Sequence, residues 1–520
     1  MTHATTLKGR SLEIHRRHLL AGGLAAGALA ASGGLRGARA QEGTLLRVAA
    51  NTNPSTLDPV TGRSGGDHQF LYPLYDTLIR WKPETLEPIP GLAKAWSYPD
   101  DTTLVLELRE GLTFHDGTPL DAAAVKAHLD RARSDETSNI KVDLGSVAEV
   151  EATGPTTVTL KLTAPDRSLP LILTDRAGMV VSPAAVEANG GSVDRNPVGA
   201  GAFKYVEWQD MQVVAYERFE DFWEAGLPKV DRMTMQIIPE VTTGVRSVIA
   251  GQNDIVVTVP SVQKVLLDRT PNVTVHAEPS LYLHMNYMDF SRPPFDDVRV
   301  RRAMNLAIDR EAFVKAAMGG LGEPATTLYP KAYWAHDEGL EDILAYDPDR
   351  ARALIKETGV EEVEFTAVAY QDQAAIQRRE VLMSMWDKVG IKAKVTTTTV
   401  AEGSQMFFFQ KSVDSFFAAI TARPDPSMVP SIIFGKDSSY NGGRQAIPGM
   451  DEAIAASRVG TTQEERKAAL SRVQRIALEQ AVFVPLLFEV HIVGVSDRFS
   501  GYQPNLLGRP RYEHVEPVTS

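Results

Sequence analysis

Alternating and helically spaced apolar residues divide most of the chain into short strands and amphipathic helices. Leu104, Leu106 and Leu108 alternate with polar residues, which predicts a half-buried strand over 103–109. Over 298–308 the apolar residues instead recur at i, i+3, i+4, i+7 and i+8, which is typical of an amphipathic helix. Near residue 290 the pattern changes from strand-rich to an alternation of helices and strands.

The first half of the chain is predicted to hold a strand over 45–50, a helix over 68–80 and a helix from Asp121 to about Arg133. The runs 147–153 and 156–162 flank Gly154-Pro155 and predict a hairpin. Together with the strand over 103–109, these elements indicate a small α+β lobe.

The second half predicts an α/β lobe. A strand over 363–370, a helix to about 389 and a strand over 391–400 form a predicted β-α-β unit. In the helix over 298–308, Arg299, Arg301 and Arg302 are expected on a solvated outer face, so they do not indicate nucleic-acid binding.

Two distant loops carry the chemistry that suggests a binding site. The first is the glycine-rich stretch 62–68, in which Ser64, Gly65 and His68 stand at the start of a predicted helix. Free backbone N–H groups there can bind an anion or a ligand carbonyl, although a plain helix-capping loop explains each residue equally well. The second is Arg423-Pro424-Asp425-Pro426, a proline-stiffened turn that bears a guanidinium and a carboxylate. We expect these loops to face each other and to clamp a small ligand.

The first forty residues read as an export signal. Arg16-Arg17 precedes an apolar run to Leu35, and Ala38-Arg39-Ala40 provides a small-x-small cleavage site. The adjacent arginines fit a twin-arginine signal, which implies export in the folded state. The run is too rich in glycine to predict a stable membrane span.

Charge and composition narrow the function further. The chain has a net charge of −12, and because the first forty residues carry +5, removing them would give −17. An acidic exported protein is not expected to bind nucleic acid. The absence of cysteine excludes disulfides, thiol catalysis, cysteine zinc sites and an N-terminal lipid anchor on cysteine. We therefore expect a periplasmic protein without a lipid tether.

Two rival classes have to be considered. Residues 62–66 match the G-x-S-x-G nucleophile elbow of serine hydrolases, but that motif needs a buried strand directly before it, and Pro54 and Pro59 separate it from the nearest one. Metal binding is the other rival. The eleven histidines are scattered without ligand spacing, so no protein-bound metal or cofactor is expected, although a metal within an organic chelate stays open.

Many separate stretches resemble the peptide/nickel class of solute-binding proteins of ABC importers, in family order from about residue 45 to the end. They are Thr56-Leu57-Asp58-Pro59, Pro90-Gly91-Leu92-Ala93, Leu108-Arg109-Glu110-Gly111, Phe114-His115-Asp116-Gly117-Thr118-Pro119, Pro197-Val198-Gly199-Ala200-Gly201, residues 294–303, Ala307-Ile308-Asp309-Arg310, Tyr346-Asp347-Pro348, Gly390-Ile391-Lys392 and residues 423–426.

The resemblance implies an α/β periplasmic-binding-protein fold of type II, cluster C, with an additional small α+β lobe. Lobe I would comprise 43–76, 197–278 and 486–520, the small lobe 77–196, and lobe II 279–485. It also implies a monomer that closes its two large lobes over a ligand and delivers it to a membrane permease without chemistry.

The resemblance makes Arg423 the residue on which the ligand class depends. In the peptide binders of this class an aspartate just before the Asp-Pro pair accepts the amino terminus of the peptide, but here Thr421, Ala422 and Arg423 stand there. A guanidinium suits a carboxylate instead. We expect Asp425, Asn441, Arg444 and Tyr370 to complete the pocket. The alternatives are an ion pair between Arg423 and Asp425, and a surface position for Arg444.

Overall fold

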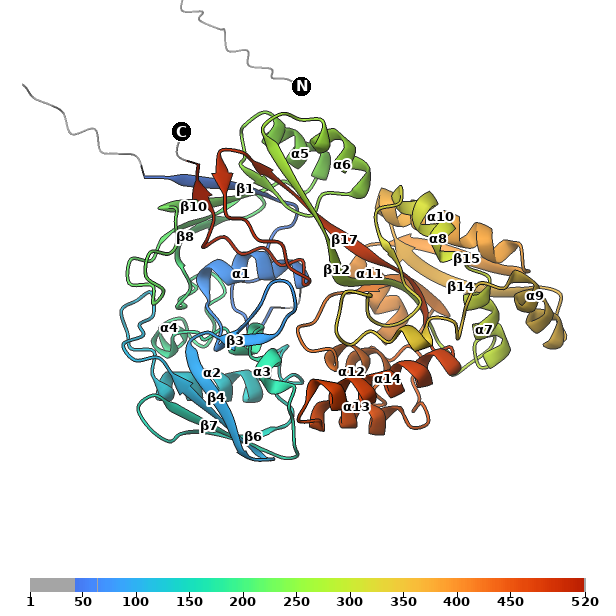
Figure 1. The fold of residues 1–520 in the computed structure, drawn as a ribbon, viewed down its shortest axis with the longest axis horizontal. Coiled ribbons are helices and arrows are strands. Elements are labelled where there is room, and N and C mark those ends of the chain that lie inside the picture. The colour runs from blue at the N-terminus through green and yellow to red at the C-terminus, as the bar shows by residue number, and fades with distance from the viewer. Residues whose placement is uncertain (1–42, 63, 519–520) are drawn as a thin grey trace, which may run out of the picture. The chain divides into compact units, whose positions relative to one another are not determined.

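An eleven-stranded mixed sheet organises the described part of the chain, which in this computed structural model comprises residues 43–62 and 64–518. The predicted export signal over 1–40 lies outside these residues. Two long antiparallel strands, β12 (Val273–Met288) and β17 (Val484–Ser496), form the middle of the sheet and run side by side in Figure 1. Their register shifts between Pro279 and Leu283 and again between His284 and Met285.

We call the strands on one side of this central pair the β1 half-sheet. Its order from β17 outward is β11 (Ile255–Val256), β1 (Leu45–Ala50), β10 (Arg232–Ile237), β9 (Val213–Arg218) and β8 (Phe203–Gln209). The helices α1 (His68–Leu74), α5 (Val241–Ile249) and α6 (Ser261–Asp268) and the 3-10 helix η1 (Gly65–Asp67) belong to this region. The strand predicted over 45–50 is confirmed.

The strands on the other side form the β14 half-sheet. Its order from β12 outward is β16 (Ser415–Ile420), β14 (Val363–Tyr370) and β15 (Ile391–Thr398), while β13 (Glu323–Pro324) pairs with β17. The helix α10 (Gln373–Asp387) connects the parallel strands β14 and β15, which confirms the predicted β-α-β unit. Trp386 at the end of α10 is fully buried, and its indole N–H donates to the Met304 carbonyl.

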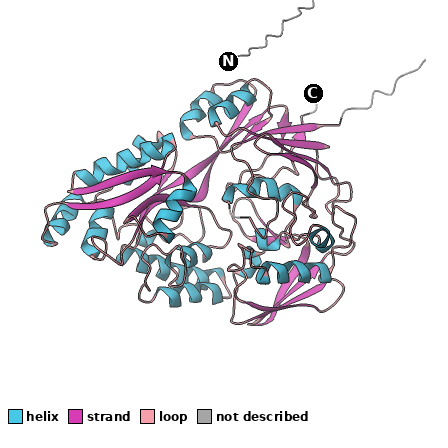
Figure 2. Cartoon of the chain, turned by 180° about the vertical axis from the view of Figure 1, so that it is seen from behind, coloured by secondary structure: helices cyan, strands magenta, loops and turns pink. Residues whose placement is uncertain are grey.

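Helices flank the strands of the β14 half-sheet, as Figure 2 shows. They are α7 (Val298–Leu306), α8 (Arg310–Met318), η3 (Glu338–Leu340), α9 (Pro348–Glu357), α11 (Val400–Ser404), the π-helix η4 (Gln405–Phe409), α12 (Met428–Phe434), α13 (Met450–Val459) and α14 (Gln463–Glu479).

The small α+β region is built on a separate four-stranded antiparallel sheet. Its order is β4 (Ala93–Asp100), β5 (Thr103–Leu108), β7 (Thr157–Leu162) and β6 (Val147–Ala152). The helix α2 (Ala122–Ser134) packs on it, and its N-cap Asp121 accepts from the backbone N–H of Ala124. The same part of the chain contains β2 (Ile79–Trp81), β3 (Pro88–Pro90), α3 (Leu169–Ile172), η2 (Arg176–Gly178) and α4 (Pro183–Ala188), and β18 (Phe499–Ser500) pairs with β19 (Glu516–Pro517) near the C-terminus. The predicted strand over 103–109, the hairpin and the Asp121 cap are confirmed.

Two sequence expectations are wrong in detail. The helix that begins at His68 ends at Leu74 rather than Arg80, because the Asp76 carboxylate accepts from the Thr77 N–H and the chain enters β2 at Ile79. Arg301 is buried rather than solvated, since its guanidinium donates to the carbonyls of Phe295 and Gln480.

Candidate functional site

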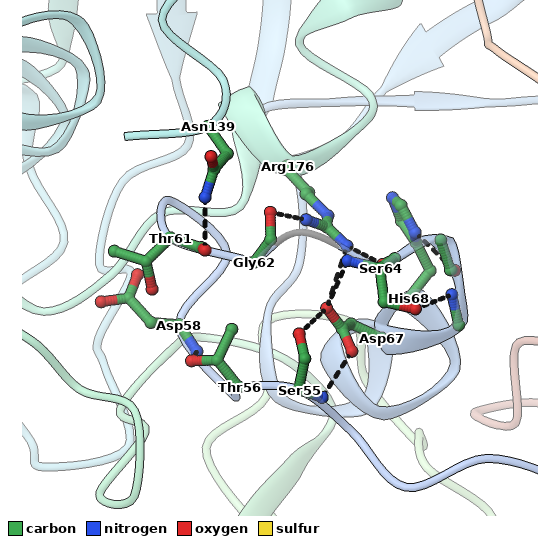
Figure 3. Close-up of polar contacts among 12 residues, drawn as sticks. Ser55, Thr56, Asp58, Thr61, Gly62, Ser64, Asp67, His68, Asn139 and Arg176 are labelled. Carbon is green, nitrogen blue, oxygen red and sulfur yellow. Dashed lines mark hydrogen bonds and ion pairs between the residues drawn. The ribbon is translucent and has the colours of Figure 1, made fainter. Parts of the chain in front are cut away.

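The glycine-rich loop is held by its own side chains. Ser64 caps η1 by accepting from the Gly66 N–H at 3.1 Å, and the buried Asp67 carboxylate accepts from the Ser64 N–H at 3.2 Å. Asp67 also accepts from the backbone and hydroxyl of Ser55 at 2.8 and 2.7 Å, as Figure 3 shows. Ser64 and Gly65 themselves are exposed. The hydrogen bonds fix the backbone of the loop, while these two residues stay accessible to a ligand.

A buried guanidinium holds the same loop. Arg176 donates to the carbonyls of Gly62 and Ser64 and lies 3.4 Å from an Asp67 carboxylate oxygen (Figure 3). Since Arg176 follows Asp175 directly, the turn that carries both residues positions the loop. Neither Asp175 nor Arg176 stands in a motif from which the sequence would predict this role.

His68 belongs to a buried network. Its Nε2 lies 2.6 Å from Asp175 Oδ1 and its Nδ1 lies 3.0 Å from the Gly65 carbonyl. The other oxygen of Asp175 accepts from Arg509 at 2.8 Å, and Arg509 also donates to the Ala422 carbonyl at 3.0 Å. Burial, reinforced by Arg509, lowers the pKa of His68 to about 4. His68 is thus tied into the contact between the two loops.

The two loops meet, as the sequence analysis expects. A Cβ atom placed on Gly65 would lie 3.2 Å from Cγ2 of Thr421. This distance leaves no room for a ligand directly between Gly65 and Thr421. Any ligand bound there has to lie beside this contact, along the rest of the Arg423 turn.

The Arg423 turn is braced from several directions. The fully buried Asp425 accepts from Arg466 at 2.8 and 2.7 Å and from the N–H of Ser427 at 2.9 Å. The hydroxyls of Tyr329 and Tyr333 donate to the carbonyls of Pro426 and Pro424 at 2.7 and 3.3 Å. These contacts fix the backbone on both sides of Arg423.

Arg423 is left with an unused guanidinium. The alternative of an ion pair with Asp425 is wrong, because Asp425 pairs with Arg466. Among residues 43–62 and 64–518, no carboxylate lies within ion-pair distance of Arg423, and its Nε is buried without a hydrogen-bond partner. Arg423 also borders a small apolar pocket, whose walls include Leu281, Leu283, Tyr329, Tyr333, Ile420 and Val429.

Tyr370 lines a different cavity. It ends β14 and lies edge-on to Phe416 with ring centroids 5.4 Å apart. With His284 and Arg378 it lines a small cavity, and burial raises the pKa of Tyr370 to about 12. Its phenol is therefore neutral near pH 7.

Asn441 and Arg444 brace their own loop. The Asn441 side-chain amide donates to carbonyls of Gly435 and Gln445, and its oxygen accepts from the Gly443 N–H. Arg444 lies 3.1 Å from an Asp289 oxygen and donates to the Phe407 and Phe408 carbonyls. Among the described residues, neither the Asn441 nor the Arg444 side chain forms a hydrogen bond or ion pair with Arg423. Their role in ligand binding therefore stays a prediction.

Among residues 43–62 and 64–518, none is placed as a catalytic partner of Ser64. β1 ends at Ala50, so no strand enters the Gly62–Gly66 turn directly, and the ring nitrogens of His68 face Gly65 and Asp175 rather than the Ser64 hydroxyl. Within the described chain, no cluster of three or more histidine or acidic side chains could hold a metal ion. No helix in the same residues is long and apolar enough to cross a membrane.

Comparison with known proteins identifies the family. Residues 87–441, more than half of the chain, match the model of the bacterial extracellular solute-binding proteins, family 5 Middle. The chain is 29% identical over 511 residues to the glutathione-binding protein GsiB of Escherichia coli O1:K1 / APEC, a match that covers 94% of this chain and 96% of GsiB.

Solved structures share the fold. The dipeptide-binding protein of Pseudoalteromonas sp. SM9913 in complex with Met-Leu superposes with a TM-score of 0.81 at 22% identity, over 91% of this chain and all of that one. NikZ of Campylobacter jejuni in complex with Ni(L-His) gives 0.78 at 21% identity, over 89% and 96% of the two chains.

These matches confirm the resemblance and the fold class that the sequence indicates, and the hydrolase alternative is wrong because the family binds solutes. The chain belongs to the family 5 bacterial extracellular solute-binding proteins and is the solute-binding component of an ABC importer, not an enzyme.

Proposed function

We propose that the protein captures a short peptide or a peptide-like compound and that Arg423 binds a carboxylate of this solute. The observation that carries the proposal is the guanidinium of Arg423, which has no ion-pair partner among the described residues although its turn is braced on both sides. A guanidinium presents a planar fork of donors that matches a carboxylate, and partial burial strengthens such a pair.

The small apolar pocket beside Arg423 could contact an apolar part of the same solute. Its walls are aliphatic and aromatic, with Arg423 at the border, so one charged and one apolar group of a ligand could be bound side by side. The tyrosine hydroxyls that hold the turn keep Arg423 in place before the ligand arrives, which lowers the entropic cost of binding.

The relatives support a peptide-like solute. GsiB is named as a glutathione-binding protein, and the Pseudoalteromonas protein was solved with the dipeptide Met-Leu. Both compounds are small and carry a free carboxylate. NikZ was solved with Ni(L-His), so a metal chelate with a carboxylate belongs in the same test.

Binding would proceed by closure of two lobes. We assign 43–76, 197–278 and 486–520 to lobe I, 77–196 to the small lobe, and 279–485 to lobe II. The register shifts near Pro279 and Leu283 in the central strands offer a place for bending. Ser64 and Gly65 would contact the ligand from lobe I and Arg423 from lobe II. His68 and Asp425 would hold these loops in place. Tyr370, Asn441 and Arg444 would complete the pocket from lobe II.

The cellular setting belongs to the same proposal. The Arg16-Arg17 signal would direct folded protein to the periplasm, where the closed form would be presented to the membrane permease.

Calorimetric titration tests the ligand class. The panel is glutathione, Met-Leu, their C-terminal amides, and Ni(L-His). We expect at least one carboxylate-bearing member to bind, and we expect its amide and the Arg423→Ala variant each to lose roughly 10- to 100-fold in affinity, as for a charged hydrogen bond. Arg350→Ala, at an exposed surface pair, is the control. Because the amide of glutathione keeps the carboxylate of its γ-glutamyl residue, the decisive pair is Met-Leu and its amide, and equal affinity of these two would refute the role of Arg423.

A further inference from the structure

One side chain from the second half of the chain is packed into the core of the small α+β region. Met428 is the first residue of α12, and it is only 3% exposed. It belongs to the apolar cluster of the small α+β region, which includes Leu144, Leu169 and Ile172. Within the described part of the chain, every other buried member of this cluster lies at or before Ala200. Met428 therefore joins two regions that are far apart in the sequence.

A polar contact joins the same two regions. Arg167, two residues before α3, donates from its backbone N–H to the carbonyl of Arg458 at the end of α13, at 2.6 Å. The Arg458 guanidinium lies 4.0 Å from the buried Asp166 carboxylate and donates to the Ser431 hydroxyl of α12 at 3.1 Å. Helices α12 and α13 thus both contact the small α+β region.

The small α+β region fixes its side of this junction by contacts of its own. The Asp166 carboxylate accepts from the Ser146 hydroxyl at 2.7 Å and from the Ser168 N–H at 2.9 Å. The Tyr98 hydroxyl donates to the Asp166 carbonyl at 2.8 Å. The segment that meets α13 is therefore held in place by its own region.

The position of Met428 is tied to the Arg423 turn. Asp425 accepts from the N–H and the hydroxyl of Ser427 at 2.9 and 2.6 Å, and its carbonyl accepts from the Met428 N–H at 3.2 Å. Arg466 holds the same carboxylate. The turn and the start of α12 are thus one hydrogen-bonded unit, so a movement of Arg423 toward a ligand would also move Met428.

We propose that Met428 is the latch of lobe closure: its side chain enters the apolar core of the small α+β region when the lobes close and, together with Arg458, sets the population of the closed form. The latch rests on the proposed function, because it takes closure of two lobes as the way in which the solute is bound. It makes the small α+β region, as well as lobe I, a partner on which lobe II closes.

The physical chemistry of methionine suits this role. Insertion removes an apolar side chain from water, so the hydrophobic effect favours the closed form. Methionine has an unbranched chain with three rotatable bonds, which lets it fill a gap without an exact fit. Because the apparent affinity for a ligand scales with the population of the binding-competent form, loss of the latch should weaken binding of any solute, whatever its chemistry.

Disulfide trapping tests the latch in ligand-free protein. The chain has no cysteine, so Arg167→Cys together with Arg458→Cys introduces a single pair. The backbone hydrogen bond between these residues places their Cα atoms roughly 5–6 Å apart, a distance that a disulfide spans. In this background we expect Met428→Ala to slow disulfide formation roughly tenfold. Met428→Leu keeps the volume and should change the rate less than about twofold.

Two further variants keep the test decisive. Met428→Val should give an intermediate rate, and it replaces Met428→Ala if that variant does not fold. Met304→Ala removes a fully buried methionine from α7, outside the junction, and should lower the unfolding free energy without slowing disulfide formation. An unchanged rate in both Met428→Ala and Met428→Val would overturn the latch. Equal slowing in Met304→Ala would overturn it too, because any loss of core packing would then open the junction.

Calorimetric titration of the cysteine-free protein separates the latch from the proposed function. We expect Met428→Ala to weaken Met-Leu and its C-terminal amide by the same factor, roughly tenfold, whereas Arg423→Ala should weaken only the acid. If acid and amide bind the wild type equally, or if neither binds, the carboxylate role of Arg423 fails while the disulfide rates still decide the latch. If Met428→Ala slows disulfide formation but leaves a measurable affinity unchanged, the contact is not coupled to binding and the latch is overturned.

Discussion

The carboxylate of Asp425 receives the guanidinium of Arg466, whose Nη2 lies 2.8 and 2.7 Å from its two oxygens. Arg466 comes from α14, forty-one residues further along the chain, and it also donates to the Ser457 carbonyl. Asp425 stands two residues after Arg423, and because it pairs with Arg466 it does not pair with Arg423. As a result, Arg466 fixes the turn, and the guanidinium of Arg423 is left without an ion-pair partner among the described residues and can bind a ligand.

Breaking this pair should destabilise the protein. Asp425 is fully buried, so Arg466→Ala would leave a buried carboxylate without its cation, which typically costs about 3–5 kcal/mol of unfolding free energy. Urea denaturation measures the loss. Arg350→Ala, which breaks an exposed pair with Glu357, should change stability by less than about 0.5 kcal/mol. Losses of similar size in both variants would contradict a structural role for the Asp425–Arg466 pair.

Filling the space at Gly65 should hinder closure without harming the fold. Gly65 is exposed, and a Cβ there already meets Thr421 at 3.2 Å, so the larger side chain of Gly65→Leu would push the two loops apart. We expect solute affinity to fall at least about tenfold, with unfolding of the ligand-free protein changed by less than about 1 kcal/mol.

A second substitution checks that the effect arises at this contact. Thr421→Ala removes the methyl group that Gly65→Leu would meet and should restore part of the affinity in the double variant. If Thr421→Ala gives no recovery, Gly65→Leu acts elsewhere. Small-angle X-ray scattering with and without solute would report closure directly.

Three histidines, of which His68 and His128 are buried and His115 is partly buried, should make the protein sensitive to acid. Burial lowers the pKa of His68, His115 and His128 to about 4 each, whereas the unfolded chain protonates them near pH 6.5. The unfolded state therefore binds up to three more protons between pH 6.5 and pH 4. Unfolding free energy should fall as the pH falls through this window, by at most about 4 kcal/mol per pH unit.

The contribution of one histidine can be isolated. His128 Nε2 faces the Ala177 carbonyl at 3.2 Å, a contact that a glutamine amide can replace. Denaturation curves of His128→Gln at several pH values should show less pH dependence than those of the wild type between pH 6.5 and pH 4. An unchanged slope would mean that His128 is protonated in the folded protein.

Asp143→Asn should stabilise the ligand-free protein at neutral pH. The folded-state pKa of Asp143 is raised to about 6, so its contribution to stability is present at low pH and is lost as the pH rises through about 6. At pH 7 the variant should be more stable than the wild type, by at most about 3 kcal/mol and less because the side chain is partly exposed. Near pH 4 the two should be alike. A loss of stability at pH 7 would reveal a native partner for this carboxylate.

Local pattern was enough for many of the elements. The alternation of Leu104, Leu106 and Leu108, the Asp121 cap and the β-α-β pattern over 363–400 each depend on residues close in sequence, and all three are confirmed. Helix α1 was predicted six residues too long, because an apolar stripe does not reveal that the Asp76 side chain takes the Thr77 N–H.

The charged groups around the site depended on distant partners. In the sequence, Asp425 is the acid nearest to Arg423, and this proximity favours an ion pair between the two. The structure brings Arg466 to Asp425 and Arg509 to Asp175, across 41 and 334 residues. No spacing rule connects residues so far apart, because their meeting depends on how the helices and the C-terminal segment pack.

The sequence by itself determined the family and the α/β class of this protein, since family motifs and periodic patterns are local and each survives without its neighbours. It also singled out the glycine-rich loop and the Arg423 turn. Only the tertiary structure decided that Arg423 has no ion-pair partner among the described residues and that His68 is hydrogen-bonded to Asp175. The reason is physical: whether a charge is free or neutralised depends on which groups the fold brings within a few ångströms of it.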